Sequence, residues 1–208
     1  MLATMAVIHH TTLVPSKLEL LASWLPSQPW YAATGAEPDL AKAGGFRLDD
    51  PDGAVGIEFM IVTDQSGRQT ATYHVPLAYR GAPLAGAADA LVGETEHGVL
   101  GRRWVYDGER DPVLMAQLAA LVRGSVAAQA QSLSETADRS VVAHLDGPDL
   151  DSTDLAVADL RVLRRLEPGS ADAPASPAGS RGYVEAGWVL PDGSAVRGYL
   201  VVALGAPE

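Results

Sequence analysis

Runs of alternating apolar and polar residues, separated by turn-forming residues, recur along this 208-residue chain. This alternation has the two-residue period of a β-strand with one buried face. Residues 45–49 and 55–63 are two strand-like runs, and Asp50-Pro-Asp-Gly53 lies between them. Because aspartate, proline and glycine preset a tight turn, the two runs are predicted to form an antiparallel hairpin. This part of the chain is therefore predicted to contribute antiparallel strands to an α+β layer.

Strand-like runs continue to the end of the chain. A second hairpin is predicted from residues 182–190 and 195–204, where Pro191-Asp-Gly-Ser194 supplies the turn. The stretch 85–100 fits neither a helix nor a strand pattern clearly. The other predicted strands are residues 2–10, 70–79, 102–106, 140–145 and 155–166.

Two segments have the helical spacing of apolar residues. Leu18, Leu21 and Leu25 lie on one stripe of a predicted helix. Pro15 suits its first turn and Pro26 stops it, because proline has no amide hydrogen to donate to the helix. The second helix begins after Asp111, whose carboxylate can cap it, with Pro112 in the favoured first position. Its apolar stripe consists of Val113, Leu114, Leu118, Leu121 and Val122.

The chain is acidic, with 26 acidic against 15 basic side chains and a formal net charge of −11. Nucleic-acid phosphates and anionic lipids attract positive fields, so neither is an expected partner. There is no run of about 18 apolar residues to span a bilayer, and no N-terminal secretion signal is recognisable. The chain is therefore predicted to be soluble and cytoplasmic. The absence of cysteine excludes disulfides, thiolate metal sites and cysteine nucleophiles.

Three groups of polar residues have some potential for chemistry, but a structural role explains each better. His9 and His10 are neighbours in a predicted strand, so their side chains point to opposite faces and do not easily share a metal ion. The acidic stretch 146–154 lacks the carboxylate spacing, central glycine and final glutamate of a calcium loop. Glu94, Glu96 and His97 have acid–base character but no neighbouring nucleophile. No catalytic, cofactor-binding or metal-binding residue is therefore predicted.

Aromatic and arginine side chains form a more informative set. Aromatic faces stack on sugar rings, and guanidinium groups bond hydroxyls or carboxylates. The alternative is packing in the core, because aromatic side chains bury large areas. The candidate interaction surface consists of Trp24, Trp30, Tyr31, Arg102, Arg103, Trp104 and Tyr106.

Long strings around these aromatic residues resemble a known family. Residues 17–31, KLELLASWLPSQPWY, and residues 95–108, TEHGVLGRRWVYDG, are similar to the N-terminal cap of bacterial maltokinases and related aminosugar kinases. The strings GGFRLDDP at 44–51 and VPLAYRG at 75–81 also resemble this cap, so the similarity covers roughly residues 5–132. The resemblance implies a curved antiparallel sheet packed on a helix, as in a cystatin-like cap. The predicted strands and helices agree with this fold.

The second half of the chain resembles the nucleotide-binding lobe that follows the cap in those kinases. Residues 160–169, LRVLRRLEPG, look like the strand that carries the phosphate-pairing lysine, but Arg161 occupies that position. A planar guanidinium does not reproduce the geometry of that lysine at the α- and β-phosphates. Prolines in 170–177 preclude the helix that brings the partner glutamate, and no catalytic loop or magnesium-binding carboxylates follow. The resemblance therefore implies a degenerate, non-catalytic relative.

These features predict an α+β protein in three parts. The parts are a cap-like domain over residues 1–110, a connecting helix and linker over 111–138, and a second antiparallel β-rich unit over 139–208 that resembles a truncated kinase N-lobe.

The resemblance implies an interaction or regulatory module in bacterial α-glucan and trehalose metabolism. Its expected protein partner is a sugar kinase or a trehalose or α-glucan enzyme, and no cofactor is expected. The alternatives are a binding protein for a small sugar or a nucleotide, which would use the aromatic and arginine side chains, and an unconventional sugar kinase.

Overall fold

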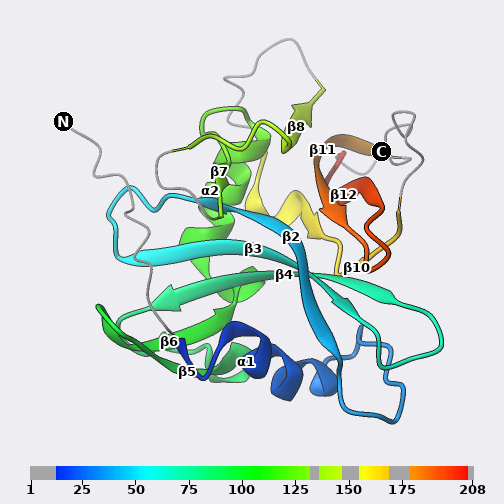
Figure 1. The fold of residues 1–208 in the computed structure, drawn as a ribbon. Helices are drawn as coiled ribbons and strands as arrows, with labels where there is room; N and C mark the ends of the chain where they lie inside the picture. Colours follow the sequence, from blue (N-terminus) through cyan, green and yellow to red (C-terminus); the bar gives the residue numbers. More distant parts are fainter. Residues whose placement is uncertain (1–12, 132–135, 147–154, 169–178, 206–208) are drawn as a thin grey trace.

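The computed structural model describes residues 13–131, 136–146, 155–168 and 179–205 (Figure 1). Within these ranges the α-helices are α1 (Lys17–Trp24) and α2 (Pro112–Val122), and the 3-10 helices are η1 (Leu25–Ser27), η2 (Ala88–Ala90), η3 (Gly108–Arg110) and η4 (Val157–Asp159). The strands are β1 (Leu13–Val14), β2 (Leu40–Leu48), β3 (Val55–Asp64), β4 (Ala71–Arg80), β5 (Leu91–His97), β6 (Gly101–Asp107), β7 (Gln129–Ala130), β8 (Val142–Leu145), β9 (Leu160–Val162), β10 (Arg165–Leu166), β11 (Ser180–Val189) and β12 (Ala195–Leu204).

The strands form one connected antiparallel sheet in the order β1-β5-β6-β4-β3-β2-β11-β12-β9. Three short strands join it beside this path, namely β7 on β2, β8 on β11 and β10 on β4. The α+β class is thus confirmed in its coarse form, a large antiparallel sheet with two short α-helices. The cystatin-like cap is not clearly reproduced, because the sheet continues beyond the cap strands and the helices cover opposite faces (Figure 1).

One face of the central strands packs against α1. Met60 and Val62 of β3 and Val75 of β4 belong to the same buried cluster as Leu21 and Trp24 of the helix. The helix begins where the serine hydroxyl of Ser16 accepts the amide of residue 19, and the side chain of that residue accepts the Ser16 amide in return. This capping box fixes the start of α1 and so the stripe that it turns to the sheet.

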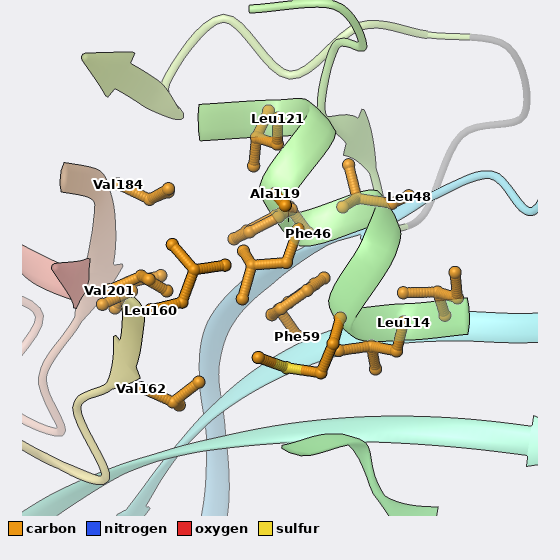
Figure 2. Close-up of a cluster of buried hydrophobic side chains, with 14 of the residues drawn as sticks. Phe46, Leu48, Phe59, Leu114, Ala119, Leu121, Leu160, Val162, Val184 and Val201 are labelled. Carbon is orange, nitrogen blue, oxygen red and sulfur yellow. The ribbon is translucent and has the colours of Figure 1, made fainter. Parts of the chain in front are cut away.

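The opposite face of the same strands packs against α2. Figure 2 shows Phe46 of β2 and Phe59 of β3 beside α2, in one cluster with Leu114 and Ala119 of the helix. The two phenyl rings are stacked with centroids 4.5 Å apart. Val184 and Val201, from β11 and β12, belong to the same buried cluster. The second half of the chain therefore completes a core that begins in the first half.

The two halves meet at a narrow seam in the sheet. Between β2 and β11 the register contains one residue pair, Gly44 with Trp188. A Cβ on Gly44 would lie 3.0 Å from the carbonyl oxygen of Gly187 and 3.1 Å from the Cβ of Trp188, so glycine permits this close approach. The domain boundaries predicted at 110/111 and 138/139 stay predictions, while one sheet and one core extend across them.

Most predicted elements are confirmed, with differences at their ends. Both predicted hairpins form, as β2–β3 and β11–β12, and the unclear stretch 85–100 contains η2 and β5. Asp111 caps α2, as predicted, by accepting the amides of Val113 and Leu114. Pro15 lies before the Ser16 cap, so the prediction that it occupies the first helical turn is wrong. The predicted strand 2–10 lies outside the described residues.

The prediction of one strand over 155–166 is wrong. The segment forms η4, β9 and β10, and the two strands pair with different neighbours: β9 with β12, and β10 with β4. Between them, the amide of Leu163 donates to Leu200 and the carbonyl of Arg164 accepts from His74. The chain therefore changes partner strand at this point, and the alternation of side chains alone does not reveal such a change.

A proline lies inside the central strand β4, where it would normally remove a ladder bond. Pro76 pairs with Phe59 of β3. The amide of His74, two residues earlier, donates to Arg164 on the other side of β4, so strand alternation places the nitrogen of Pro76 on that same side. There β10 pairs with residues 72–73 and β6 pairs with residues 77–80. The proline thus lies at the gap between two short strands, where no donor is needed.

Candidate functional site

Three of the candidate aromatic residues lie together at the end of α1. The rings of Trp24 and Trp30 meet edge to face with centroids 5.7 Å apart, and Trp30 and Tyr31 both contact Tyr73 of β4, at 6.0 and 5.3 Å. Trp24 is buried, and Trp30 and Tyr31 are half-buried against the same apolar cluster. These rings pack on one another and on the sheet, the alternative that the sequence left open.

Tyr31 also has a polar contact beneath this cluster. Its hydroxyl donates to Asp64 at 2.7 Å, and burial, with the charge and hydrogen bond of Asp64, raises the pKa of Tyr31 to about 12. Burial acts to raise the pKa of Asp64, but hydrogen bonds from Tyr31, Ser66 and the Asp39 amide lower it overall. The pair therefore holds a neutral phenol against a carboxylate, which fixes the loop after η1 to the end of β3.

The other candidate residues lie on β6, with different exposures. Tyr106 is buried, and its hydroxyl accepts the amide of Leu84 at 2.9 Å. Arg103 donates to the carbonyl of Leu100 at 2.7 Å. Arg102 is exposed, forms an ion pair with Glu94 and lies 5.3 Å above the ring of Trp104. Only the Arg102 and Trp104 end of β6 thus reaches the surface.

Apolar side chains accompany this exposed end of β6. Val99 and Leu100, in the β5–β6 turn, are 62% and 48% exposed, and Val14 of β1 is 66% exposed. A shallow depression of about 160 Å³ is lined by Val14, Arg102 and the β5 residues 94–96. We call the set Val14, Val99, Leu100, Arg102 and Trp104 the hairpin surface.

Arg161, the residue at the expected lysine position, turns back onto its own chain. It is exposed on β9, and its Nη1 donates to the carbonyls of Ala158 at 2.8 Å and Leu160 at 3.0 Å. These bonds close the junction between η4 and β9. The guanidinium is thus held by backbone groups next to it in the sequence.

The arginine that reaches across the molecule is instead Arg164. It is 8% exposed, and its guanidinium contacts the carboxylates of Asp107 at 2.5 Å and Glu109 at 2.5 and 2.9 Å. Its Cζ also lies 5.1 Å from the ring of Trp30. The sequence analysis did not single out Arg164. One side chain from the second half thereby joins β6, η3 and the loop after η1.

His74 lies in β4 beneath Arg164 and is fully buried. Its Nδ1 is 3.2 Å from the carbonyl of Leu163, so this nitrogen carries the hydrogen. Burial, reinforced by the positive charge of Arg164, lowers the pKa of His74 to about 3. The imidazole is therefore neutral in the folded protein.

Glu58 of β3 is a second buried charged residue that the sequence analysis missed. Lys17, at the start of α1, contacts its two carboxylate oxygens at 2.8 and 2.6 Å. The hydroxyl of Tyr79 donates to it at 2.9 Å and the amide of Gln131 at 3.1 Å. Burial and the charge of Glu58 raise the pKa of Tyr79 well above its ordinary value. Both carboxylate oxygens are engaged, so this group anchors α1 to the sheet.

The remaining polar groups have local contacts or lie outside the described residues. The Nδ1 of His97 accepts the amides of Val99 and Leu100 at 3.3 and 3.1 Å, and so supports the hairpin turn. Asp146 contacts His144 at 2.8 Å. In the described ranges, no group of three histidine or acidic side chains has a metal-binding arrangement, and no helix is long and apolar enough to cross a membrane. His9, His10 and residues 147–154 lie outside those ranges.

Sequence signals for the two buried charged groups were weak. Glu58 lies at the centre of an apolar strand, VGIEFMIV, and a lone acid in such a run indicates a buried carboxylate that needs a cation. Arg164 stands in the pair Arg164-Arg165, and no feature of the string separates the buried arginine from the exposed one. Their partners lie 41 and 57 residues away in the sequence.

Comparison with known proteins identifies the region that contains the hairpin surface, apart from Val14. Residues 24–111 match the family model of the maltokinase N-terminal cap domain. No curated protein matches the chain. The matched segment runs from the end of α1 to the residue that caps α2, and it includes β2 to β6. Residues 24–111 are therefore a maltokinase N-terminal cap-like region.

Proposed function

We propose that this chain is a non-catalytic, cap-like interaction module that binds a protein of bacterial α-glucan or trehalose metabolism, such as a sugar kinase. The observation that carries the proposal is the match of residues 24–111 to the maltokinase cap domain. The hairpin surface lies within that region, apart from Val14 of β1, and combines exposed apolar side chains with an arginine–tryptophan pair. Aromatic and arginine side chains are enriched at the centres of protein interfaces.

The packing of the aromatic residues favours this proposal over a sugar receptor built from them. Trp24, Trp30 and Tyr31 contact one another or Tyr73, so their faces are occupied within the protein. The position of Arg161 likewise supports a non-catalytic role, because its guanidinium bonds to adjacent carbonyls and a phosphate-pairing lysine has to point into a nucleotide site.

Binding of purified sugar kinases and trehalose or α-glucan enzymes from the same genome tests the proposal. We expect one of them to bind the full chain, and we expect the double variant Val99→Ser/Leu100→Ser to weaken binding by about tenfold or more, as for loss of an interface anchor. Val157→Ser is the matched control, because Val157 is 42% exposed on η4 and outside the hairpin surface. The proposal fails if none of these enzymes binds, or if both variants bind equally well.

Enzymatic assay tests the non-catalytic part separately. The purified chain, incubated with ATP, Mg²⁺ and maltose or glucosamine, should form no sugar phosphate above the background of a protein-free sample. Time-dependent and protein-dependent phosphorylation would overturn this part of the proposal and favour an unconventional kinase.

A further inference from the structure

Three basic side chains gather around the buried carboxylate of Glu58. The chain contains two lysines, Lys17 and Lys42, and both lie here. Partial desolvation lowers the pKa of Lys42, the charge of Glu58 opposes this shift and the charge of Lys17 adds to it, so the Lys42 ammonium lies near both groups. Arg47 of β2 pairs directly with Glu58 of β3, and directly paired residues project from the same face of a sheet. We call Lys17, Lys42 and Arg47 the basic cluster.

Glu58 does not compensate all three of these charges. Its two carboxylate oxygens already accept hydrogen bonds from the Lys17 ammonium, the Tyr79 hydroxyl and a glutamine amide. Within the described ranges, the side chains of Lys42 and Arg47 donate no hydrogen bond and form no ion pair. Lys42 is exposed and Arg47 is half-buried. The basic cluster therefore contains two cations that are open to an anion from another molecule.

The charge of the whole chain restricts which anion can bind. The formal net charge is −11, so the protein as a whole repels a long polyanion such as a nucleic acid, and also an anionic membrane. A short anionic group responds chiefly to charges within about 10 Å, because salt screens the more distant ones. The basic cluster therefore favours a few local negative charges over an extended array of them.

The spacing of the two open cations favours a segment that carries two carboxylates. Lys42 and Arg47 pair with β3 residues four positions apart, which corresponds to about 13 Å along the strand at about 3.3 Å per residue. Two carboxylates several residues apart can each meet one cation, and a carboxylate forms a planar two-bond contact with a guanidinium. A phosphate dianion would instead bring about twice the charge towards Glu58.

We propose that the basic cluster binds an acidic segment of a partner protein, with one carboxylate at Lys42 and a second at Arg47. Local charge complementarity sets the specificity of such a contact and the rate at which it forms. Because both cations lack an anion within the described part of the chain, the segment replaces no existing ion pair.

The basic cluster and the hairpin surface lie on opposite faces of the sheet. Trp104 of the hairpin surface pairs with Arg80, the residue after Tyr79 in β4, and adjacent strand residues point to opposite faces. Tyr79 is the residue that donates to Glu58. An acidic segment at the basic cluster thus leaves the hairpin surface open, and the proposal does not rest on that surface.

Titration with short peptides tests the ligand class on the unmodified chain. The probe is a blocked peptide with two glutamates separated by three serines, and the controls are the same peptide with glutamine in place of both glutamates, and inorganic phosphate. In an NMR titration of the ¹⁵N-labelled protein at low salt, the acidic peptide should give saturable shifts of the amides at 17, 42 and 47, with a dissociation constant about tenfold below that of either control. No saturable shift, shifts centred elsewhere, or equally tight binding of either control would overturn the proposal.

Variants test the site itself. Lys42→Met and Arg47→Met should each raise the dissociation constant of the acidic peptide by about tenfold, as for a lost charge-assisted hydrogen bond. Arg68→Met is the matched control, because it removes the same charge from an exposed position between β3 and β4, and it should leave the constant unchanged. Equal effects of Arg47→Met and Arg68→Met would show that binding follows the net charge of the chain and would overturn the site. The amide shifts of the unmodified chain decide the matter if a variant fails to fold.

Discussion

Arg164 joins parts of the chain that are far apart in sequence. Its guanidinium contacts Asp107 and Glu109, and it lies over the ring of Trp30. A buried charge of this kind is held by its partners and leaves them uncompensated when it is removed. The contribution of Arg164 to stability can therefore be measured with a variant that leaves the two carboxylates without their cation.

Replacement of Arg164 by methionine should lower the free energy of unfolding by about 3–5 kcal/mol, because Asp107 then keeps a negative charge in a buried position without the cation that compensates it. Urea unfolding at neutral pH measures this loss. Arg165→Met is the matched control, since the neighbouring side chain is exposed, and it should change the stability by less than about 0.5 kcal/mol. A loss of the same size in both variants would show that Arg164 does not join the halves.

His74 should make stability depend on acid pH. Its pKa is lowered from 6.5 to about 3 in the folded protein, so the unfolded chain takes up the proton first as the pH falls. The stabilisation is fully present above pH 6.5 and is lost towards pH 3, by roughly 5 kcal/mol in total. His74→Gln should remove this dependence between pH 6.5 and 4 in urea unfolding, while the exposed control His144→Gln should keep it. Parallel pH profiles of His74→Gln and the unmodified chain would contradict the assignment.

At the residue scale, sequence reasoning was least informative about side-chain partners. It selected Arg161 by position in a string and overlooked Arg164, three residues later. Burial of an arginine depends on whether carboxylates are brought to it, and here those carboxylates come from β6 and η3. No local pattern carries that information. The reading of aromatic residues as core or surface stayed open for the same reason.

At the scale of elements, sequence reasoning succeeded where the signal is local. The β2–β3 and β11–β12 turns and the cap of α2 each depend on a few adjacent residues, and all three form as predicted. The prediction of one strand over 155–166 was wrong because β9 and β10 pair with different strands. The alternation of side chains indicates which face of a strand is buried but not which strand lies beside it.

Asp111, the residue that caps α2, has two structural roles, and different substitutions can separate them. Asp111 accepts two helix amides and also a bidentate contact from Arg80, at 2.6 and 3.1 Å, while itself fully buried. Asp111→Ala should cost about 2–4 kcal/mol, because both roles are lost and Arg80 keeps its charge. Asp111→Asn retains an acceptor for the amides and should cost less. Thermal or urea unfolding of the two variants measures the difference, and equal losses would mean that the cap contributes little.

At the scale of the whole molecule, the cap-like region does not bury both faces of its own sheet. Phe46 and Phe59 are covered by α2 and by residues of β9, β11 and β12, all of which follow the matched segment (Figure 2). This dependence could not be predicted from the sequence, because the covering strands lie about 100 to 160 residues after the strands that they cover.

A fragment of residues 1–111 should therefore fail to form the native cap. Exposure of the apolar face under α2 removes the burial that stabilises β2 and β3. We expect little near-UV circular dichroism and poorly dispersed amide resonances from this fragment, in contrast to the full chain. A cooperative unfolding transition of the isolated fragment, with dispersed resonances, would show that the first half folds alone.

Pro76 limits where the two halves can abut. If β10 shifted along β4 by two residues towards Pro76, one of its carbonyls would face the nitrogen of Pro76, which has no hydrogen to donate. A shift of β6 along β4 in the opposite direction would bring a carbonyl of β6 to the same nitrogen. Pro76 thus limits the extension of both short strands along β4, and the gap between the ends of β6 and β10 lies at this residue. In this register Arg164, the residue before β10, contacts Asp107 at the end of β6 and Glu109 in η3, so a proline within the matched segment bears on how the second half joins it.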